Sequence, residues 1–133
     1  MTTLFKDDIA IPIEPFEPCF GTMGVSPTGP EKPVIMPPGP FGGNTDTRHI
    51  TKDSLLYLPV QHEGALFSCG DAHAAQGDGE VCVTGIECPR YATLRLDLIK
   101  GRIIPAPQFQ TPGPSRRWSR TWAGTPRWAS TRT

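Results

Sequence analysis

The stretch that decides the fold is residues 55–99, LLYLPVQHEGALFSCGDAHAAQGDGEVCVTGIECPRYATLRLDLI. Four short runs in it are rich in β-branched, aromatic and leucine residues. Each is bounded by glycine, proline or acidic residues, which is typical of strands joined by turns. The runs are residues 55–60, 65–69, 80–87 and 92–99. In the last run, every second residue from Leu94 to Leu98 is a leucine and those between are charged, so a half-buried strand is predicted.

The sequence on either side favours the same class of fold. Residues 9–13 and 20–25 predict two further strands, and residues 103–104 a short closing one. Sixteen prolines and fourteen glycines in 133 residues argue against long helices, because both interrupt regular structure. Residues 33–43, PVIMPPGPFGG, must be extended or turning for the same reason. We therefore predict an all-β fold, sandwich or barrel-like, with short strands and Pro/Gly-rich connections.

The overall charge excludes some classes of partner. Thirteen basic and thirteen acidic residues cancel, which gives no electrostatic reason to expect nucleic acid or an anionic membrane. No apolar run approaches the roughly 20 residues that span a bilayer. The first fifteen residues contain acids and a proline where a signal peptide needs a continuous apolar core. We expect a cytoplasmic protein with neither nucleic acid nor membrane as its partner.

The four cysteines are Cys19, Cys69, Cys82 and Cys88. None lies in a CxxC pair, which argues against a zinc ribbon or a thioredoxin-type motif. Without a secretion signal we expect buried free thiols and no disulfide framework. Cys69 directly precedes an acidic segment that contains a histidine. It is therefore the candidate nucleophile of a cysteine-dependent mechanism.

That segment, residues 70–80 (GDAHAAQGDGE), is the one most able to carry chemistry. Asp71 and His73 are two apart, so extended backbone points both to one side, and Asp78 and Glu80 share this spacing. A turn between the pairs would gather three carboxylates, an imidazole and the Gln76 amide in one pocket. Close carboxylates repel unless a cation or proton is present. A divalent metal would resolve this repulsion, with zinc first and calcium if more oxygens join. On spacing alone, a solvated polar turn between two strands is an equal alternative.

A second cluster is GGNTD, residues 42–46. Asn44 and Asp46 share a face if the backbone is extended, and the paired glycines permit a close approach to another group. The alternative is a simple Asx turn. His49 and His62 have no assignable partners, and we expect both at the surface.

The last stretch, residues 115–133, differs in kind: SRRWSRTWAGTPRWASTRT has five arginines, all three tryptophans and no acid. It could be an arm for single-stranded nucleic acid or a segment that lies on a membrane surface. We favour a third interpretation, out-of-frame translation of GC-rich DNA, because the composition changes abruptly. This interpretation predicts a disordered or poorly packed tail.

Several of these segments together resemble the acetamidase/formamidase family. The matching stretches are GGNTD (42–46), SLLYLPV (54–60), GALFSCGDAHAAQGDGE (64–80), GIE (85–87) and LRLDLIKGRIIPAPQFQTPGP (94–114). The earlier FGTMGVSP (20–27) resembles that family's GxxGVAP-type segment. Family members are longer at both ends. We therefore divide the chain into a partial, incomplete β domain over residues 1–114 and the Arg/Trp-rich tail over residues 115–133.

The resemblance implies an amidase: metal-assisted hydrolysis of small linear amides, formamide or acetamide, to the carboxylate and ammonia. It implies that Asp71 and His73 hold the metal or the attacking water, with Asp46 as a further ligand. The metal it implies is divalent, and zinc is the leading expectation.

The catalytic roles follow the same resemblance. Glu80 is the expected general base, and Asp78 or Gln76 orients it. Asn44 would donate a hydrogen bond to the developing oxyanion, so Asn44 and Gln76 are the expected substrate-binding residues.

Two rival functions stay open beside the enzyme. The first is an inactive truncated amidase remnant that binds metal without turnover. The second is a basic-tailed binding module that uses Trp118 and Trp122. A homo-oligomer is also left open, because a partner subunit could supply missing core.

Overall fold

The computed structural model describes residues 2–13, 17–29 and 32–112, with side chains from Lys6 onward. Its regular structure consists of short strands and a single 3-10 turn. The strands are β1 (Thr2–Lys6), β2 (Ile9–Pro12), β3 (Cys19–Gly24), β4 (Gly42–Asn44), β5 (Leu55–Tyr57), β6 (Ser68–Ala75), β7 (Ile86–Glu87) and β8 (Gln108–Gln110), and the turn η1 is Val81–Val83. The all-β class predicted from the sequence is confirmed. The interpretations of the Arg/Trp-rich tail concern residues that lie outside the described ranges.

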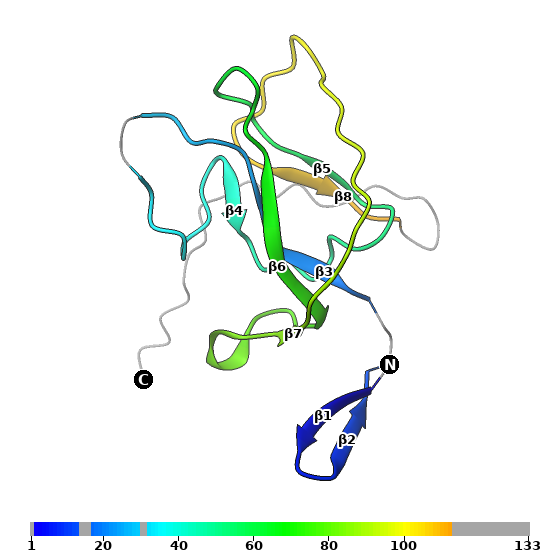
Figure 1. Cartoon of the computed structure of the whole chain (residues 1–133). Coiled ribbons are helices and arrows are strands. Elements are labelled where there is room, and N and C mark those ends of the chain that lie inside the picture. Colours follow the sequence, from blue (N-terminus) through cyan, green and yellow to red (C-terminus); the bar gives the residue numbers. More distant parts are fainter. Residues whose placement is uncertain (1, 14–16, 30–31, 113–133) are drawn as a thin grey trace.

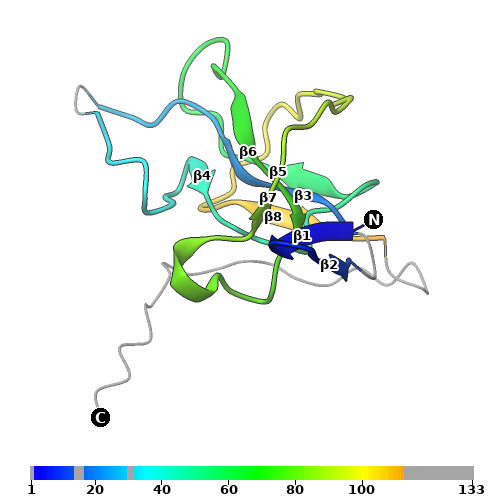
Figure 2. The same cartoon turned by 60° about the horizontal axis from the view of Figure 1, so that its bottom comes forward.

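The central sheet has the strand order β4-β3-β6-β7, and neighbouring strands are antiparallel. β6 crosses the middle of the molecule beside β3 (Figure 1). β5 and β8 form a separate two-stranded sheet, and β1 and β2 form a hairpin apart from the rest. Figure 2 shows the same arrangement with the hairpin brought to the front. Within the described residues, no helix is long and apolar enough to cross a bilayer.

The core lies along β3, where burial alternates as the pleat of a strand requires. Cys19, Gly21 and Met23 are buried, while Phe20 and Thr22 are partly exposed. The buried apolar side chains are Ile13, Cys19, Met23, Val25, Ala74 and Phe109. His73 is the fully buried large side chain of the described residues, and it lies opposite Cys19 on β6. A polar imidazole is therefore buried where β6 pairs with β3.

Three of the predicted strands match observed ones: residues 9–13 contain β2, residues 20–25 overlap β3 and residues 55–60 contain β5. The strand predicted at residues 65–69 is shifted. β6 runs from Ser68 to Ala75, so the Asp-Ala-His-Ala sequence lies within the sheet and the chain turns only afterwards. The physical reason is the length of β3, which offers β6 hydrogen bonds from Gly24 back to Cys19.

Other strand predictions were wrong. Within residues 80–87, Val81–Val83 form η1, where Cys82 and Val83 have φ values of 62° and 61°, and only the last two residues join the sheet as β7. Residues 92–99 and 103–104 form no strand in the described structure. β8 at Gln108–Gln110, which was not predicted, pairs instead with β5. Periodicity alone did not locate strands here, because a strand also requires a neighbour with free backbone groups.

The four cysteines are all free thiols, as predicted. Their expected burial holds only for Cys19, because Cys69 and Cys82 are exposed and Cys88 is partly exposed. His49 and His62 are at the surface as expected, although each has a polar neighbour: Asp78 lies by His49, and the Pro27 carbonyl by His62.

Candidate active site

His73 stands at the centre of the candidate site, placed there by the pairing of β6 with β3. Its Nε2 lies 3.1 Å from Asp71 Oδ1 and 3.7 Å from Glu80 Oε1. Its Nδ1 lies 2.8 Å from Gln76 Oε1. An amide oxygen can only accept a hydrogen bond, so Nδ1 carries the proton and donates it to Gln76. The other ring nitrogen, Nε2, therefore faces the carboxylates.

Gln76 fixes this orientation from both ends of its amide. While Oε1 accepts from His73, Nε2 donates to the backbone carbonyl of Asp46, thirty residues earlier. The Cys19 thiol adds a weak contact to the same Oε1 at 4.0 Å. Burial, followed by the charge of Asp46, raises the pKa of Cys19 to about 11, so this thiol stays protonated. A histidine whose one ring nitrogen donates to a fixed partner, while the other faces carboxylates, is the usual arrangement of a metal ligand.

The carboxylates of Asp71 and Asp46 both lie against Gly21 of β3. A Cβ at this position would collide with Oδ2 of Asp71 and with Oδ1 of Asp46. The Gly21 carbonyl also accepts hydrogen bonds from the backbone N–H groups of Thr45 and Asp46, both at 3.0 Å. The missing side chain thus lets the loop after β4 bring its carboxylate over the middle of the sheet.

The backbone at both acids lies in the left-handed region. φ is 42° at Asp46 and 58° at Asp71, a conformation that L-residues rarely adopt and that aspartate tolerates better than most. Such values persist only where the surrounding structure imposes them, and they concentrate at functional sites. The hydrogen bonds to Gly21 and the pairing of β6 supply that constraint.

The acids form two overlapping groups around His73. Ligand atoms of Asp46, His73 and Glu80 lie within 4.8 Å of one another, and so do those of Asp71, His73 and Glu87. Oδ1 of Asp46 is buried without a hydrogen-bond partner among the described residues. A buried carboxylate oxygen without a donor is unfavourable unless a proton or a cation meets it.

The pKa values of Asp46 and His73 are both raised where the acids crowd around the imidazole. Burial, then the negative charges of Glu80 and Asp71, raise the pKa of Asp46 to about 6. For His73, burial acts to lower the pKa, but the hydrogen bond to Gln76 and the charges of Asp71 and Glu80 outweigh it, and the pKa is raised. The cluster therefore holds protons that a cation would replace, and its set of one imidazole and several carboxylates suits zinc.

Two residues expected at the site lie elsewhere. Asp78 is exposed, and its Oδ1 is 3.4 Å from His49 Nε2. Asn44 pairs with Thr22, whose Oγ1 donates to its Oδ1 at 2.8 Å, and its Nδ2 donates to the Met36 carbonyl at 3.2 Å. Thr22 faces the side of β3 opposite to Gly21, so the Asn44 amide lies across the sheet from the acids.

Glu87 is the site residue that local spacing missed. It lies opposite His73 in the pairing of β6 with β7, fourteen residues later in the sequence. Gly85 permits this approach, since a Cβ there would lie 2.9 Å from His73 Nδ1. No i, i+2 relationship indicates either residue. The only signal was the GIE tripeptide within the family resemblance.

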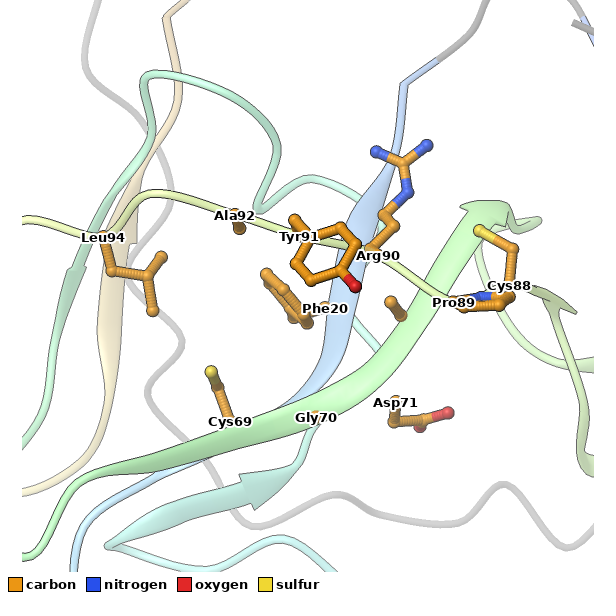
Figure 3. A pocket seen from close by; sticks show the side chains of 11 residues that line it. Phe20, Cys69, Gly70, Asp71, Cys88, Pro89, Arg90, Tyr91, Ala92 and Leu94 are labelled. Carbon is orange, nitrogen blue, oxygen red and sulfur yellow. The ribbon is translucent and has the colours of Figure 1, made fainter.

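A hollow of about 450 Å³ adjoins this part of the sheet, and Phe20, Tyr91 and Leu94 line it together with Cys69. Figure 3 shows Cys69 pointing toward Phe20, whereas Asp71 points away from that ring. His73 is absent from the lining, and no hydrogen bond within the described residues joins Cys69 to an imidazole. The geometry supplies Cys69 with no base, which disfavours the thiol mechanism.

Comparison with known proteins places this geometry. The Acetamidase/Formamidase family model matches residues 18–123. An acetamidase from Mycolicibacterium smegmatis is 39% identical over 89 residues, which cover 61% of this chain and 22% of that protein. A formamidase from Methylophilus methylotrophus is 40% identical over 80 residues, or 56% of this chain and 20% of that protein. The chain thus spans about a fifth of the length of these relatives.

The fold agrees with the sequence match. The crystal structure of an acetamidase from Yersinia enterocolitica superposes with a TM-score of 0.72 at 34% identity, covering 83% of this chain and 32% of that one. Most of the chain, including all the residues around His73, falls within the matched range. This chain belongs to the acetamidase/formamidase family.

Proposed function

We propose that the cluster around His73 hydrolyses small linear amides to the carboxylate and ammonia with the help of a divalent cation. The observation that carries this proposal is Oδ1 of Asp46, buried without a donor beside an imidazole that Gln76 has already oriented. The names of the relatives, acetamidase and formamidase, support the substrate class.

We place the cation at His73, with Asp46 from one of the two groups of ligand atoms and Asp71 from the other. His73 would offer Nε2, because Nδ1 is occupied by Gln76, and the two aspartates would offer carboxylate oxygens. The nitrogen ligand favours zinc over calcium, which prefers oxygen alone. When bound, such a cation polarises the amide carbonyl and lowers the pKa of water.

Glu80 is the group placed to move protons. Its Oε1 lies 3.7 Å from His73 Nε2, so it borders the same space without belonging to β6. Water attacks the amide carbon, a C–O bond forms, and Glu80 takes the proton that the water releases. As the C–N bond breaks, the same proton passes to the leaving nitrogen, which departs as ammonia. Gln76 acts here as a positioning residue, since it holds His73.

The test is ammonia release from formamide and acetamide by the whole chain with added zinc. The Glu80→Gln variant should lose about 100-fold or more of the rate, the usual scale of general-base catalysis. Asp78→Asn is the matched control, an exposed acid two residues away, and it should keep the rate. Equal rates in the wild type and Glu80→Gln would remove Glu80 from the mechanism.

A second candidate is a protein that binds the cation without turnover. Asp71 and Glu87 are exposed, so the described site is open, whereas hydrolytic sites commonly exclude bulk water. This alternative predicts that zinc raises the melting temperature of the wild type and of Glu80→Gln alike, while neither releases ammonia above background. Ammonia release that depends on Glu80 would eliminate it.

A further inference from the structure

Residues 91–99 have a sequence typical of a strand, but they form an exposed loop. They run outside the sheets, between β7 and β8, as the yellow part of the ribbon (Figure 1). All nine residues are exposed, including Leu96 at 70% and Leu98 at 60%. Within the described ranges, neither a strand pairing nor a backbone–backbone hydrogen bond involves them. Among the residues that the structure describes, the segment therefore has an unpaired backbone edge beside exposed leucine side chains.

We propose that two copies of this chain pair through these segments, antiparallel, about a twofold axis at Leu96. In this register Leu96 faces Leu96 of the second copy, and Leu94 faces Leu98. Arg95 faces Asp97 of the second copy, and the symmetry repeats every contact. Directly opposed residues point to the same side of a sheet. The leucines of both chains would form one face, and two Arg–Asp pairs the other.

The charges select this register over its neighbours. Moving the axis to Asp97 would oppose two aspartates, and moving it to Arg95 would oppose two arginines. A shift of one residue would place each charge opposite a leucine and mix the two faces. Like charges directly opposed destabilise a strand pair, whereas opposite charges stabilise it. Only the axis at Leu96 satisfies both the apolar and the charged positions.

Two contacts of the single chain are compatible with the pairing. Leu94, at 43%, is the least exposed of the three leucines, because it lines the hollow with Phe20 and Tyr91 (Figure 3). This contact places Leu94 against the molecule, while Leu96 and Leu98 stay exposed. Asp97 Oδ1 accepts the N–H of Leu98 at 2.8 Å, which leaves its second carboxylate oxygen for Arg95 of the second copy.

A charge swap tests the register. The wild type should dimerise in sedimentation velocity measured over a concentration series. Arg95→Asp and Asp97→Arg each convert both Arg–Asp pairs into like-charge pairs, and the dimer Kd should rise about tenfold or more. The double variant restores the opposite charges and should return the Kd to near the wild-type value. Because both residues are exposed, circular dichroism should show the same fold in all four proteins.

A crosslink tests the axis. Opposed residues of antiparallel strands have Cα atoms about 4.5–5.5 Å apart, within the range of a disulfide. Under mild oxidation Leu96→Cys should therefore form a covalent dimer faster than the wild type with its own exposed thiols. Ile103→Cys, a comparably exposed position outside the pairing, should not exceed the wild type. A monomeric wild type, a double variant without recovery, or equal crosslinking at positions 96 and 103 would overturn the proposal.

Discussion

By sequence pattern, residues 91–99 predict a strand better than β6 does, yet of these two segments only β6 is paired in the described structure. β6 contains an aspartate, a histidine and several small residues, yet it pairs with β3 from Ser68 to His73 and with β7 from His73 to Ala75. Residues 91–99 contain regularly spaced leucines and carry no pairing in the described structure. The difference lies in the neighbour: β3 presents a long edge with a glycine at its centre, and no strand in the described part of the chain faces the leucines. The partner, more than the periodicity, decides which segment becomes a strand.

The largest effect on stability should come from shortening a buried apolar side chain of β3, compared with an exposed one that follows residues 91–99. Met23 of β3 is buried, and Met23→Ala should lower the free energy of unfolding by about 2–5 kcal/mol through lost burial and a cavity. Ile103 is 96% exposed, and Ile103→Ala should change that free energy by less than about 0.5 kcal/mol. Urea denaturation of both variants measures the contrast. Similar losses would mean that Ile103 is packed in solution.

The sequence predicted the class of fold and part of the site because those features depend on local patterns. The i, i+2 spacing of Asp71 and His73 describes two side chains that the structure brings to 3.1 Å, and the glycines after them let Glu80 return to His73. Glu87 and Gly21 could not be derived in this way, since strand pairing alone brings them to the imidazole. Local spacing also cannot distinguish Asp78, which points outward.

A methyl group added at Gly21 would overfill the close contact between β3 and two of the acids. Gly21→Ala places a Cβ against both aspartate carboxylates and should cost about 1–3 kcal/mol of unfolding free energy, the usual penalty of overpacking. Gly70→Ala on β6 is the matched control, because a Cβ there meets no atom within 4 Å. Thermal denaturation of both variants, with and without zinc, reads the effect. If Gly21→Ala binds zinc as the wild type does, the two carboxylates are not ligands.

The orientation of His73 gives the next effect in size. Gln76→Ala removes the acceptor of Nδ1–H and the link to the Asp46 carbonyl. Loss of such a supporting contact weakens metal affinity by about 10–100-fold. Zinc titration by calorimetry measures it, with His49→Ala as a control because that histidine contacts only the exposed Asp78. Unchanged affinity in Gln76→Ala would show that the cation does not use His73.

The smallest effect should be the pH dependence of stability in the cation-free protein, which arises from the acids and the imidazole of the candidate site. The pKa of Asp46 is raised from 3.8 to about 6, so between these values the folded chain keeps a proton that the unfolded chain has lost. The contribution of this group to stability is therefore complete below pH 3.8 and declines as the pH rises through about 6. The raised pKa of His73 acts in the same direction above 6.5.

Melting temperatures measured from pH 4 to 8 with a chelator should thus fall across the first window, and Asp46→Asn should flatten that fall. Zinc at pH 7.5 should raise the melting temperature of the wild type more than that of Asp46→Asn, because the cation compensates the negative charge of a carboxylate that has lost its proton at this pH. A wild type whose stability increases from pH 4 to 6 would contradict the crowding of acids around His73. The exposed acids away from the cluster lack this burial. The pH response would therefore locate the pH-dependent part of the stability at the acids around His73.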